Sequence, residues 1–446
     1  VLYNLLVRYG VEKTLKYLKG MFSFVFIDLK KNTLVGARDH FGQKPFYYFN
    51  DGSIFAISSE IKSLNILKNS NLPDLNIWRT YLCSNGIINE NKTFFENILT
   101  LPAGSSIKFK ENKITTKKYF DVIDLYKGRS NFDRQLNICE TISKLDFFIS
   151  KSIKSHLISD VPIGILLSGG IDSSLIHYYA MKLDNQLTAY TKISPSIEKI
   201  PLKIIPKLFK KNPSNCRFLL QDKKKYLKDS IEFVEHTCSP ARWGGGPPMS
   251  NLCKSAYSDG IKVLLGGDGV DEMALGYNSH NVLFKKFDGN MHTFHDLISL
   301  NENSQFYDKN KLESFLNDRH LEKKFFFDID LGIKNKKEIF MKSIIYQDLS
   351  FFLQACNLPH SDAFSMKESI ELRNPFLDLD LVEFVINQRM NFLLNDEVKD
   401  FGNKFIFREL AKEKIGKFIN VKKEGTRNYS MFISNNQFWK IKNFKL

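Results

Sequence analysis

The sequence predicts an α/β protein in which helices cover a parallel sheet, with a helical C-terminal part and a β-rich unit in front. The first observation is the rhythm from residue 140 onward, where short apolar runs alternate with helical stretches. Such alternation is typical of parallel strands with helices on both faces of their sheet. The second observation is a series of short strands and turns between residues 20 and 60, which indicates a separate sheet-rich unit.

The β-rich unit begins with four predicted strands, namely Met21–Ile27, Thr33–Ala37, Phe46–Tyr48 and Ser53–Ile57. The turn Pro102–Gly104 precedes a further pair of strands. A polar stretch from Lys127 to Gln135 has the composition of a linker between domains.

The second part opens with a helical segment around Leu145–Phe148 and the apolar strand Ile163–Leu167, which leads through a Gly-rich loop into a helix from Ser173 to Leu183. The further predicted strands are Leu187–Ile193, Cys216–Leu220 and Lys262–Leu265. From about Asn281 onward, Phe and Ile recur at helical spacing, so we expect this third of the chain to be mainly helical.

The size of the chain favours two globular domains. With 446 residues, 43% of them apolar and 25% charged, the chain exceeds what one ordinary core accommodates. We expect a first domain over residues 1–125, a linker over 126–139 and a second domain over 140–446. The chain opens on Val1 with apolar residues already at helical spacing, so we expect a fragment that lacks its true start.

Composition argues against several classes of protein. The six cysteines are scattered without a CxxC pair, which fits a reducing cytoplasm better than a disulfide scaffold. The net charge of +15 comes from lysines in short pairs and triplets, a pattern typical of a solvated surface, so we expect no nucleic-acid partner. Gly, Ser or charged residues break each apolar stretch well before the roughly 18 residues that a membrane span needs, so we expect no membrane partner.

The strongest chemical signal is the loop SGGIDSS at residues 168–174, which follows a buried strand and opens a helix. Free backbone N–H groups and the positive helix end bind phosphate at such a junction, and the two glycines let the backbone approach it. Ser168 and Ser173 add hydroxyl donors. Asp172 is unsuited to touch phosphate directly, so we expect it to hold Mg²⁺. The alternative is an ordinary Ser/Gly turn that caps a helix.

A second loop, GGDGVDE at residues 266–272, follows another predicted strand. Ligands of open α/β sheets gather beyond the carboxyl ends of the strands, so we expect the two loops to face one crevice. Three carboxylates near a triphosphate require a cation, which makes Asp271 the second predicted Mg²⁺ ligand. Asp268 and Glu272 are placed to orient substrate or to position the metal's surroundings. Taken alone, a Gly/Asp turn would be ordinary structure.

The first loop resembles the SGGxDS motif of the ATP-pyrophosphatase family, whose fold is adenine nucleotide alpha hydrolase-like. In that family the loop grips the departing pyrophosphate while a nucleophile attacks the α-phosphorus. The resemblance implies ATP as the nucleotide and a binding set made of Leu167, Ser168, Gly169, Gly170, Asp172, Ser173 and Gly267. The loop lacks the lysine of a Walker A motif.

Three further segments resemble asparagine synthetases. They are Asp160-Val161-Pro162, the stretch from Ser365-Met366 to Glu371–Asp378 (ELRNPFLD), and Lys422–Gly425. The last resembles a Lys-x-Gly segment whose lysine reaches the activated phosphate, and Lys423 is the positional match. A solvated lysine is the alternative there. Arg373 could equally form a buried ion-pair corner with Glu371 and Asp378.

The N-terminal part resembles the second half of a class II glutamine amidotransferase domain, an N-terminal-nucleophile sheet fold. The segments that carry this resemblance are GMFSF at 20–24, ARDHFGQKPFYY at 37–48 and SSEIK at 58–62. In that family an N-terminal cysteine is the nucleophile and its own α-amino group is the base. Cys83 is internal, so we do not assign it this role. We expect Arg38 and Asp39 to form an ion pair that stabilises a turn rather than to act in catalysis.

The combined resemblance implies ATP-dependent amide formation with Mg²⁺. Aspartate's side-chain carboxylate would attack the α-phosphorus to give β-aspartyl-AMP and pyrophosphate, and ammonia from glutamine would then displace AMP. Asp268, Glu272 and Lys423 would serve catalysis, and Asp172 and Asp271 would hold the metal. A homodimer is possible.

Three alternatives stay open at this point. The same architecture could amidate another carboxylate, such as a uronic acid of a surface polysaccharide. Prolines at 195, 201, 206 and 213 are expected to interrupt a helix there, which would alter the nucleotide-base contacts and the acceptor pocket. The second alternative is a non-catalytic regulatory homologue, and the third is a tRNA-modifying pyrophosphatase.

His292 and His295 lack a third ligand at matching spacing, so they predict no metal site.

Overall fold

The computed structural model describes residues 1–67, 72–83, 91–127, 135–193, 200–211, 215–220, 223–240, 246–287, 333, 335–398 and 402–419. The chain separates into two compact units. Unit 1 comprises Val1–Ser152, Asp268–Asp362 and Asn374–Phe407, and unit 2 comprises Ile153–Gly267, Ala363–Arg373 and Arg408–Leu446. The second predicted loop is divided between them, because Gly267 ends a segment of unit 2 and Asp268 begins one of unit 1.

Unit 2 is built on a five-stranded sheet in the order β10-β9-β8-β11-β12. All of its neighbouring strands pair in parallel. The strands are β8 (Ile163–Leu166), β9 (Thr188–Ile193), β10 (Asn215–Leu220), β11 (Val263–Leu265) and β12 (Glu371–Arg373). The predicted parallel sheet is therefore confirmed, and β12 is an additional strand that the sequence pattern did not indicate.

The central strand β8 is buried along its whole length, as an inner strand of a parallel sheet must be. A Cβ on Gly164 would lie 3.0 Å from both the Leu264 side chain and the Thr188 carbonyl oxygen. Glycine therefore lets β8 fit between its two neighbours, and Val263 of β11 pairs with Ile163 on one side. This pairing puts the ends of β8 and β11, and the loops that follow them, next to each other.

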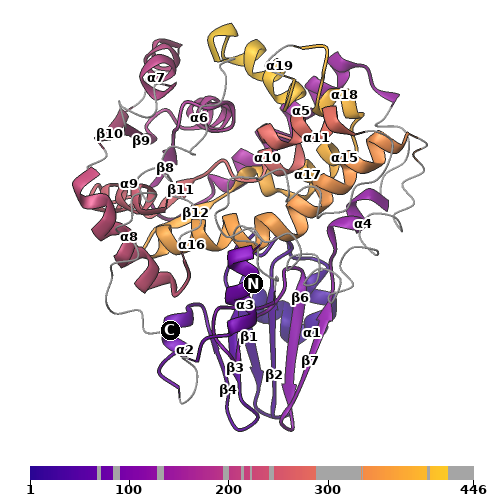
Figure 1. Ribbon diagram of the computed structural model, residues 1–446, viewed down its shortest axis with the longest axis vertical. Coiled ribbons are helices and arrows are strands. Elements are labelled where there is room, and N and C mark those ends of the chain that lie inside the picture. The colour runs from indigo at the N-terminus through magenta and orange to yellow at the C-terminus, as the bar shows by residue number, and fades with distance from the viewer. Residues whose placement is uncertain are drawn as a thin grey trace. The chain divides into compact units, whose positions relative to one another are not determined.

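Helices lie on both sides of this sheet (Figure 1), with α6 and α7 on one side and α8 and α9 on the other. They span α6 (Ile171–Leu183), α7 (Ile200–Lys211), α8 (Lys223–Thr237) and α9 (Gly246–Ser258). The core on the α8 and α9 side is an apolar cluster of strand and helix residues, including Leu166, Tyr190, Phe233, Leu252, Leu264 and Leu372. Burial of these side chains is the main force that holds the helices to the sheet.

The expected interruption by prolines is wrong for the described part of that segment. Helix α7 contains both Pro201 and Pro206. Pro201 stands in the first turn, where no intrahelical N–H bond is lost, and Pro206 removes one bond from the interior. Ile204, Ile205 and Leu208 are buried, so packing of the apolar face outweighs the cost of Pro206. Pro195 and Pro213 lie outside the described residues.

Unit 1 begins with two antiparallel sheets, ordered β1-β2-β6-β7 and β4-β3-β5. Their strands are β1 (Ser23–Asp28), β2 (Thr33–Arg38), β3 (Tyr47–Asn50), β4 (Phe55–Ser58), β5 (Ile98–Thr100), β6 (Ser105–Lys110) and β7 (Lys113–Lys118). The four predicted strands and the later strand pair are confirmed, whereas the short β5 was not expected. The two sheets share a core in which Tyr48 of β3 and Ile107 of β6 belong to one buried cluster.

The rest of unit 1 is helical, which confirms the prediction for the described part of the C-terminal third. Its helices are α1 (Leu2–Leu15), α2 (Ile61–Leu64), α3 (Leu75–Cys83), α4 (Val122–Lys127), α10 (Val270–Met273), α11 (Asn278–Lys286), α15 (Lys336–Gln347), the π-helix η2 (Asp348–Asn357), the 3₁₀ turn η3 (Pro375–Leu377), α17 (Leu379–Ile386) and α18 (Met390–Leu393). Three helices contribute to both units, namely α5 (Ile138–His156), α16 (Leu358–Met366) and α19 (Phe405–Lys414), and the turn η4 (Lys417–Ile419) belongs to unit 2.

Two expectations from composition concern the whole chain. Within the described residues, no helix combines the length and apolar character that a membrane crossing would require. Among the described cysteines, Cys139, Cys216 and Cys253 are free thiols.

Candidate functional site

The loop after β8 is a hydroxyl-lined turn that opens α6. Gly169 has φ of +78°, a conformation that favours glycine, and Gly170 caps the helix without a side chain of its own. The Ser173 hydroxyl accepts from Ser168 N at 3.2 Å and lies 3.1 Å from the Ser168 hydroxyl. These bonds hold the turn in shape, while Ser168 itself is exposed. Such a turn, with the exposed hydroxyl of Ser168 at the positive end of a helix, is suited to an anion.

The loop is anchored to the neighbouring strand. Leu167 N donates to Tyr190 O at 2.9 Å, and the Thr191 hydroxyl donates to Leu167 O at 2.7 Å. The binding loop is therefore fixed by β9 at its start and by α6 at its end. Rigid support of this kind pre-organises the donors for a ligand.

Gly267 brings the loop after β11 against the loop after β8, within unit 2. A Cβ on Gly267 would lie 3.3 Å from the Cβ of Asp172 and 3.6 Å from Ser173 N. Gly267 of the second loop thus lies against the first turn of α6, and the crevice shared by the two loops stays a prediction. A larger residue at this position would press on the first turn of α6.

Asp268, the first acid of the second loop, accepts a hydrogen bond from a serine. The Ser361 hydroxyl of α16 donates to Asp268 Oδ2 at 2.7 Å, and Ser361 is buried. Gly269 follows with φ of +106°, and a Cβ there would overlap the side chain of Leu377. The sharp turn at Gly269 therefore directs the chain into the short helix α10, which carries Asp271 and Glu272.

Glu272 is a buried anchor, only 1% exposed. The Tyr277 hydroxyl donates to Glu272 Oε1 at 2.5 Å, and Asn357 Nδ2 donates to the same oxygen at 2.7 Å. Burial, and then the negative charge of Asp271, raise the pKa of Glu272 to about 8, although the hydrogen bond from Tyr277 acts in the opposite direction. The protonated form is accordingly favoured at neutral pH. This geometry suits Glu272 for holding the loop in place.

The anchor extends to the π-helix η2, whose two ends both contribute to it. Asn357 closes η2, and Asp348 opens it with Oδ2 2.8 Å from His280 Nε2. His280 Nδ1 in turn accepts from Tyr277 N at 3.3 Å. π-Helical stretches often mark functional sites because the wider turn redirects side chains. Asn357 thus contacts Glu272 directly, whereas Asp348 contacts His280 in α11.

Asp271 forms an ion pair with Lys404, a residue that sequence reasoning missed. Lys404 Nζ lies 2.8 Å from Asp271 Oδ1, and the two side chains are 5% and 17% exposed. A lysine buried to this extent needs a negative partner. Nothing in the local sequence marks Lys404, because its partner lies more than a hundred residues earlier in the chain.

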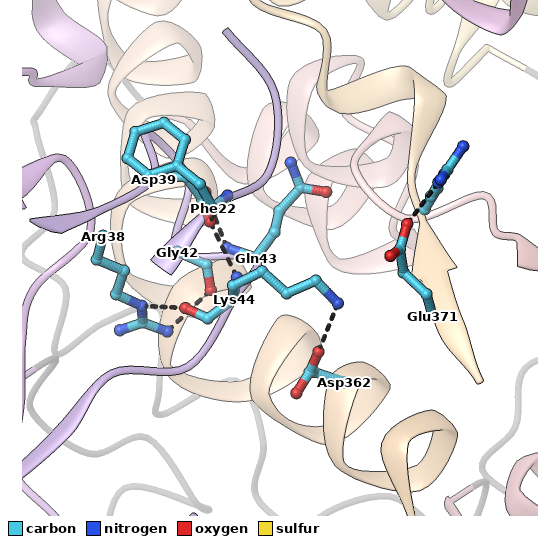
Figure 2. A network of polar contacts seen from close by, with 9 residues as sticks. Phe22, Arg38, Asp39, Gly42, Gln43, Lys44, Asp362 and Glu371 are labelled. Atoms are coloured by element: carbon cyan, nitrogen blue, oxygen red, sulfur yellow. Dashed lines mark hydrogen bonds and ion pairs between the residues drawn. The ribbon is translucent and has the colours of Figure 1, made fainter. Parts of the chain in front are cut away.

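The turn after β2 is organised by Arg38 and Asp39, as expected for a structural rather than a catalytic pair. Asp39 accepts four backbone N–H bonds, from Phe22, Phe41, Gln43 and Lys44. Arg38 donates to the carbonyl oxygens of Gly42, Lys44 and Leu101. Figure 2 shows this turn, from which the Lys44 side chain extends to Asp362, with Nζ 2.9 Å from Oδ1.

The segment ELRNPFLD at 371–378 forms a strand and a helix cap. Arg373 Nε lies 2.5 Å from Glu371 Oε1, and Arg373 Nη1 donates to the carbonyl oxygens of His156 and Ile158. Asp378 instead accepts from Asp380 N and Leu381 N at the start of α17. The Arg373–Glu371 pair is therefore observed, but it is not the buried corner of the alternative, because the Glu371 side chain is 41% exposed and Asp378 caps α17 instead.

The structure does not test where several predicted site residues lie relative to one another. Lys423, His292 and His295 lie outside the described residues. Asp172 belongs to unit 2 and Asp271 to unit 1. Among the described residues, no group of three or more His, Cys, Asp or Glu side chains could hold a metal ion. The two predicted metal ligands thus stay a prediction.

Comparison with protein families identifies both halves of the chain. The sequence model described as asparagine synthase matches residues 144–427, and the model described as glutamine amidotransferase domain matches residues 1–120. The chain belongs to the asparagine synthase family. The loops at 168–174 and 266–272 both lie inside the first match, and the Arg38–Asp39 turn lies inside the second.

Two curated relatives are 26% and 29% identical to the chain over their aligned residues. Asparagine synthetase [glutamine-hydrolyzing] 3 of Bacillus subtilis is 26% identical over 418 residues, which cover 86% of this chain and 64% of that protein. Asparagine synthetase [glutamine-hydrolyzing] 1 of the same organism is 29% identical over 292 residues, which cover 61% and 42%. The chain thus spans between about two fifths and two thirds of these relatives.

Among solved structures, NMN synthetase from Francisella tularensis covers 48% of this chain and 95% of its own, with 13% identity and a TM-score of 0.25. A likeness at this score carries no argument. The fold assignment rests on the asparagine synthase match and on the parallel sheet of unit 2.

Proposed function

We propose that the protein activates the side-chain carboxylate of aspartate with ATP and transfers ammonia to it, forming asparagine, AMP and pyrophosphate. The observation that carries the proposal is the close approach of Gly267 to Asp172, which joins the two loops of the asparagine synthase match at neighbouring strand ends. In open α/β sheets this edge is where ligands bind. The relatives' names indicate the same reaction with glutamine as the ammonia source.

The loop after β8 is assigned to the phosphates of ATP. Exposed Ser168, the backbone of Gly169 and Gly170 and the hydroxyl of Ser173 are the donors, and the N-terminus of α6 adds its partial positive charge. Leu167 and Gly267 complete the binding set as backbone that approaches the nucleotide closely. Donors fixed in advance favour the charge that develops on pyrophosphate as it leaves.

Asp172 and Asp271 are assigned to Mg²⁺. Both offer carboxylate oxygens, the donors that Mg²⁺ prefers, and both are partly accessible. When bound, the ion would polarise the α-phosphate and offset charge on the leaving group. Asp268, fixed by Ser361, would orient the incoming aspartate, and Glu272 would hold the loop. Lys423 is assigned to the activated phosphate.

The proposed reaction has two steps, adenylation of aspartate and then transfer of ammonia. A carboxylate oxygen of aspartate attacks the α-phosphorus, and the bond to pyrophosphate breaks. Ammonia then attacks the acyl carbon of β-aspartyl-AMP, loses a proton and displaces AMP. Adenylation is needed because a free carboxylate is a poor acyl donor, and the adenylate has a good leaving group. Glutamine would supply the ammonia. We assign residues 1–125 to the amidotransferase domain and residues 140–446 to the synthetase domain. We place the protein in the cytoplasm, where a thiol such as that of Cys253 persists.

The test is ammonia-dependent AMP formation with a panel of acceptors. The chain is incubated with ATP, Mg²⁺, ammonia and either aspartate, glutamate or one of several uronic acids, and AMP and the amide product are measured. We expect turnover with aspartate only, because a site built for both its α-ammonium and α-carboxylate leaves charges unpaired when a simpler acid binds. Turnover with a uronic acid and none with aspartate would replace the proposed acceptor.

A further inference from the structure

Lys404 places a positive charge beside the acidic loop, which is the loop GGDGVDE at residues 266–272. Its side chain is 5% exposed, and its Nζ lies 2.8 Å from Oδ1 of Asp271. The other two acids of the loop have different partners, since Asp268 accepts from Ser361 and Glu272 accepts from Tyr277. Of the three acids, Lys404 therefore pairs with Asp271, which the proposed function assigns, together with Asp172, to the metal.

The backbone holds Lys404 firmly in this position. Lys404 N donates to Ala274 O at 3.1 Å, and Asn403 Nδ2 donates to Gly276 O at 2.5 Å. Lys404 itself has φ of +53°, a conformation uncommon for a lysine, which shows that the surroundings determine it. The lysine is thus tied to the segment that follows Asp271 by its own backbone N–H and by the side chain of the preceding Asn403.

Gly276 makes room for the ion pair. A Cβ at Gly276 would overlap both Asp271 Oδ1 and Lys404 Cε. Gly276 N also donates to Asp271 O at 2.7 Å, which closes the turn around the carboxylate. The pair therefore occupies a space that is shaped for it, unlike a surface ion pair between two mobile side chains.

We propose that Lys404 suppresses the binding of free divalent metal at Asp271 and so reserves the loop for a metal–nucleotide complex. A divalent ion at Asp271 would lie close to the Lys404 ammonium, and the two cations repel each other. Bound nucleotide offsets this repulsion between the two cations, because its triphosphate brings several negative charges. The absence of a three-ligand acidic cluster among the described residues agrees with a site that ATP completes.

This inference rests on the proposed function, and it is tested by Mn²⁺ binding rather than by turnover. Free Mn²⁺ is measured by electron paramagnetic resonance with the full chain, first alone and then with a non-hydrolysable ATP analogue. Wild type should bind Mn²⁺ at least ten times more tightly with the analogue than without it. Lys404→Met should bind Mn²⁺ alone at least ten times more tightly than wild type, and Lys404→Arg, which keeps the charge, should resemble wild type.

The second part of the experiment assigns the tightened binding to Asp271. The double variant Lys404→Met with Asp271→Asn should lose the gain, and Lys404→Gln repeats the charge removal with a polar side chain if Lys404→Met does not fold. Equal Mn²⁺ affinity of wild type with and without the analogue overturns the inference without any variant.

Two outcomes separate this inference from the proposed function. If Asp271→Asn weakens the nucleotide-dependent Mn²⁺ binding but the charge-removing variants bind Mn²⁺ alone no more tightly than wild type, only the role of Lys404 is wrong. If Asp271→Asn leaves the nucleotide-dependent binding unchanged, the assignment of Asp271 to the metal fails, and the inference fails with it.

Discussion

Lys44 Nζ lies 2.9 Å from Asp362 Oδ1, and this ion pair joins the turn after β2 to helix α16. Asp362 directly follows Ser361, the residue that holds Asp268. The two side chains are 19% and 10% exposed, so water screens the pair less than it screens a surface pair. Within unit 1, the amidotransferase-like part is therefore linked to the acidic loop through one short stretch of helix.

A double-mutant cycle of Lys44→Met and Asp362→Asn measures the strength of this link. We expect a coupling of about 1 kcal/mol in the free energy of unfolding, because both charges are partly desolvated. The matched control is the Lys117–Glu12 pair, whose side chains are 63% and 77% exposed and which should show no measurable coupling. A coupling for Lys44–Asp362 no larger than that of the control would contradict the prediction.

Glu272 should make the stability of the protein depend on pH. Its pKa is raised from 4.5 to about 8, so between these values the folded state holds a proton that the unfolded state releases. The stability contributed by the protonated group is therefore complete below pH 4.5 and is lost as the pH rises through about 8. From pH 6 to pH 8, the free energy of unfolding of wild type should therefore fall by about 2 kcal/mol relative to that of Glu272→Gln, which lacks the titrating carboxyl. Urea unfolding at the two pH values measures this difference.

The control for this measurement is Glu111→Gln, which changes an exposed carboxylate and should follow wild type at both pH values. If the difference between Glu272→Gln and wild type is the same at pH 6 and pH 8, Glu272 is ionised in the folded protein across this range. The proposed anchoring by a protonated carboxyl would then be wrong.

Much of the fold could be predicted because its signals are local. The apolar run of β8 and the glycines after it mark a buried strand and its turn into a helix within a dozen residues, and the alternation around β1 and β2 marks the first sheet in the same way. β12 could not be predicted, because three residues show no period and pair only through β11. Helix α7 was missed because proline statistics weigh against a helix, and burial of its apolar face overrides them.

The site was predictable only where glycines and acids stand together in the sequence. Asp268, Asp271 and Glu272 form such a cluster, whereas their partners Ser361 and Lys404 come from distant segments and carry no pattern. The π-helix η2 was also beyond reach, since its sequence has the composition of any buried helix. Partners of this kind are determined by tertiary packing, which one sequence does not reveal.

Ser361→Ala should lower the rate of aspartate-dependent pyrophosphate release about tenfold. The change removes the 2.7 Å hydrogen bond to Asp268 and leaves that carboxylate less well oriented, a loss of about 1.4 kcal/mol at the transition state. The control is Ser258→Ala, whose hydroxyl is exposed and donates only to Lys254 O. Equal rates for Ser361→Ala and wild type, measured by released pyrophosphate, would show that Asp268 needs no such orientation.

Gly276→Ala should destabilise the protein by at least about 2 kcal/mol, because the new methyl group overlaps Asp271 and Lys404 in a packed space. Gly260→Ala is the matched control. It has φ of +83° and open surroundings, so its cost should be limited to backbone strain of about 1 kcal/mol. Thermal unfolding that ranks Gly276→Ala as the milder change would contradict the described packing around the ion pair.

Pyrophosphate release by Asp172→Ala tests the central claim most directly. Asp172 stands in the first turn of α6, where Gly267 meets the phosphate loop, and the account assigns it to the metal that supports adenylation. With ATP, aspartate and ammonia, wild type should release pyrophosphate and form AMP. The folded Asp172→Ala protein should lose at least about a thousandfold in rate, equivalent to about 4 kcal/mol of transition-state stabilisation. Pyrophosphate release by folded Asp172→Ala at the wild-type rate would contradict the account.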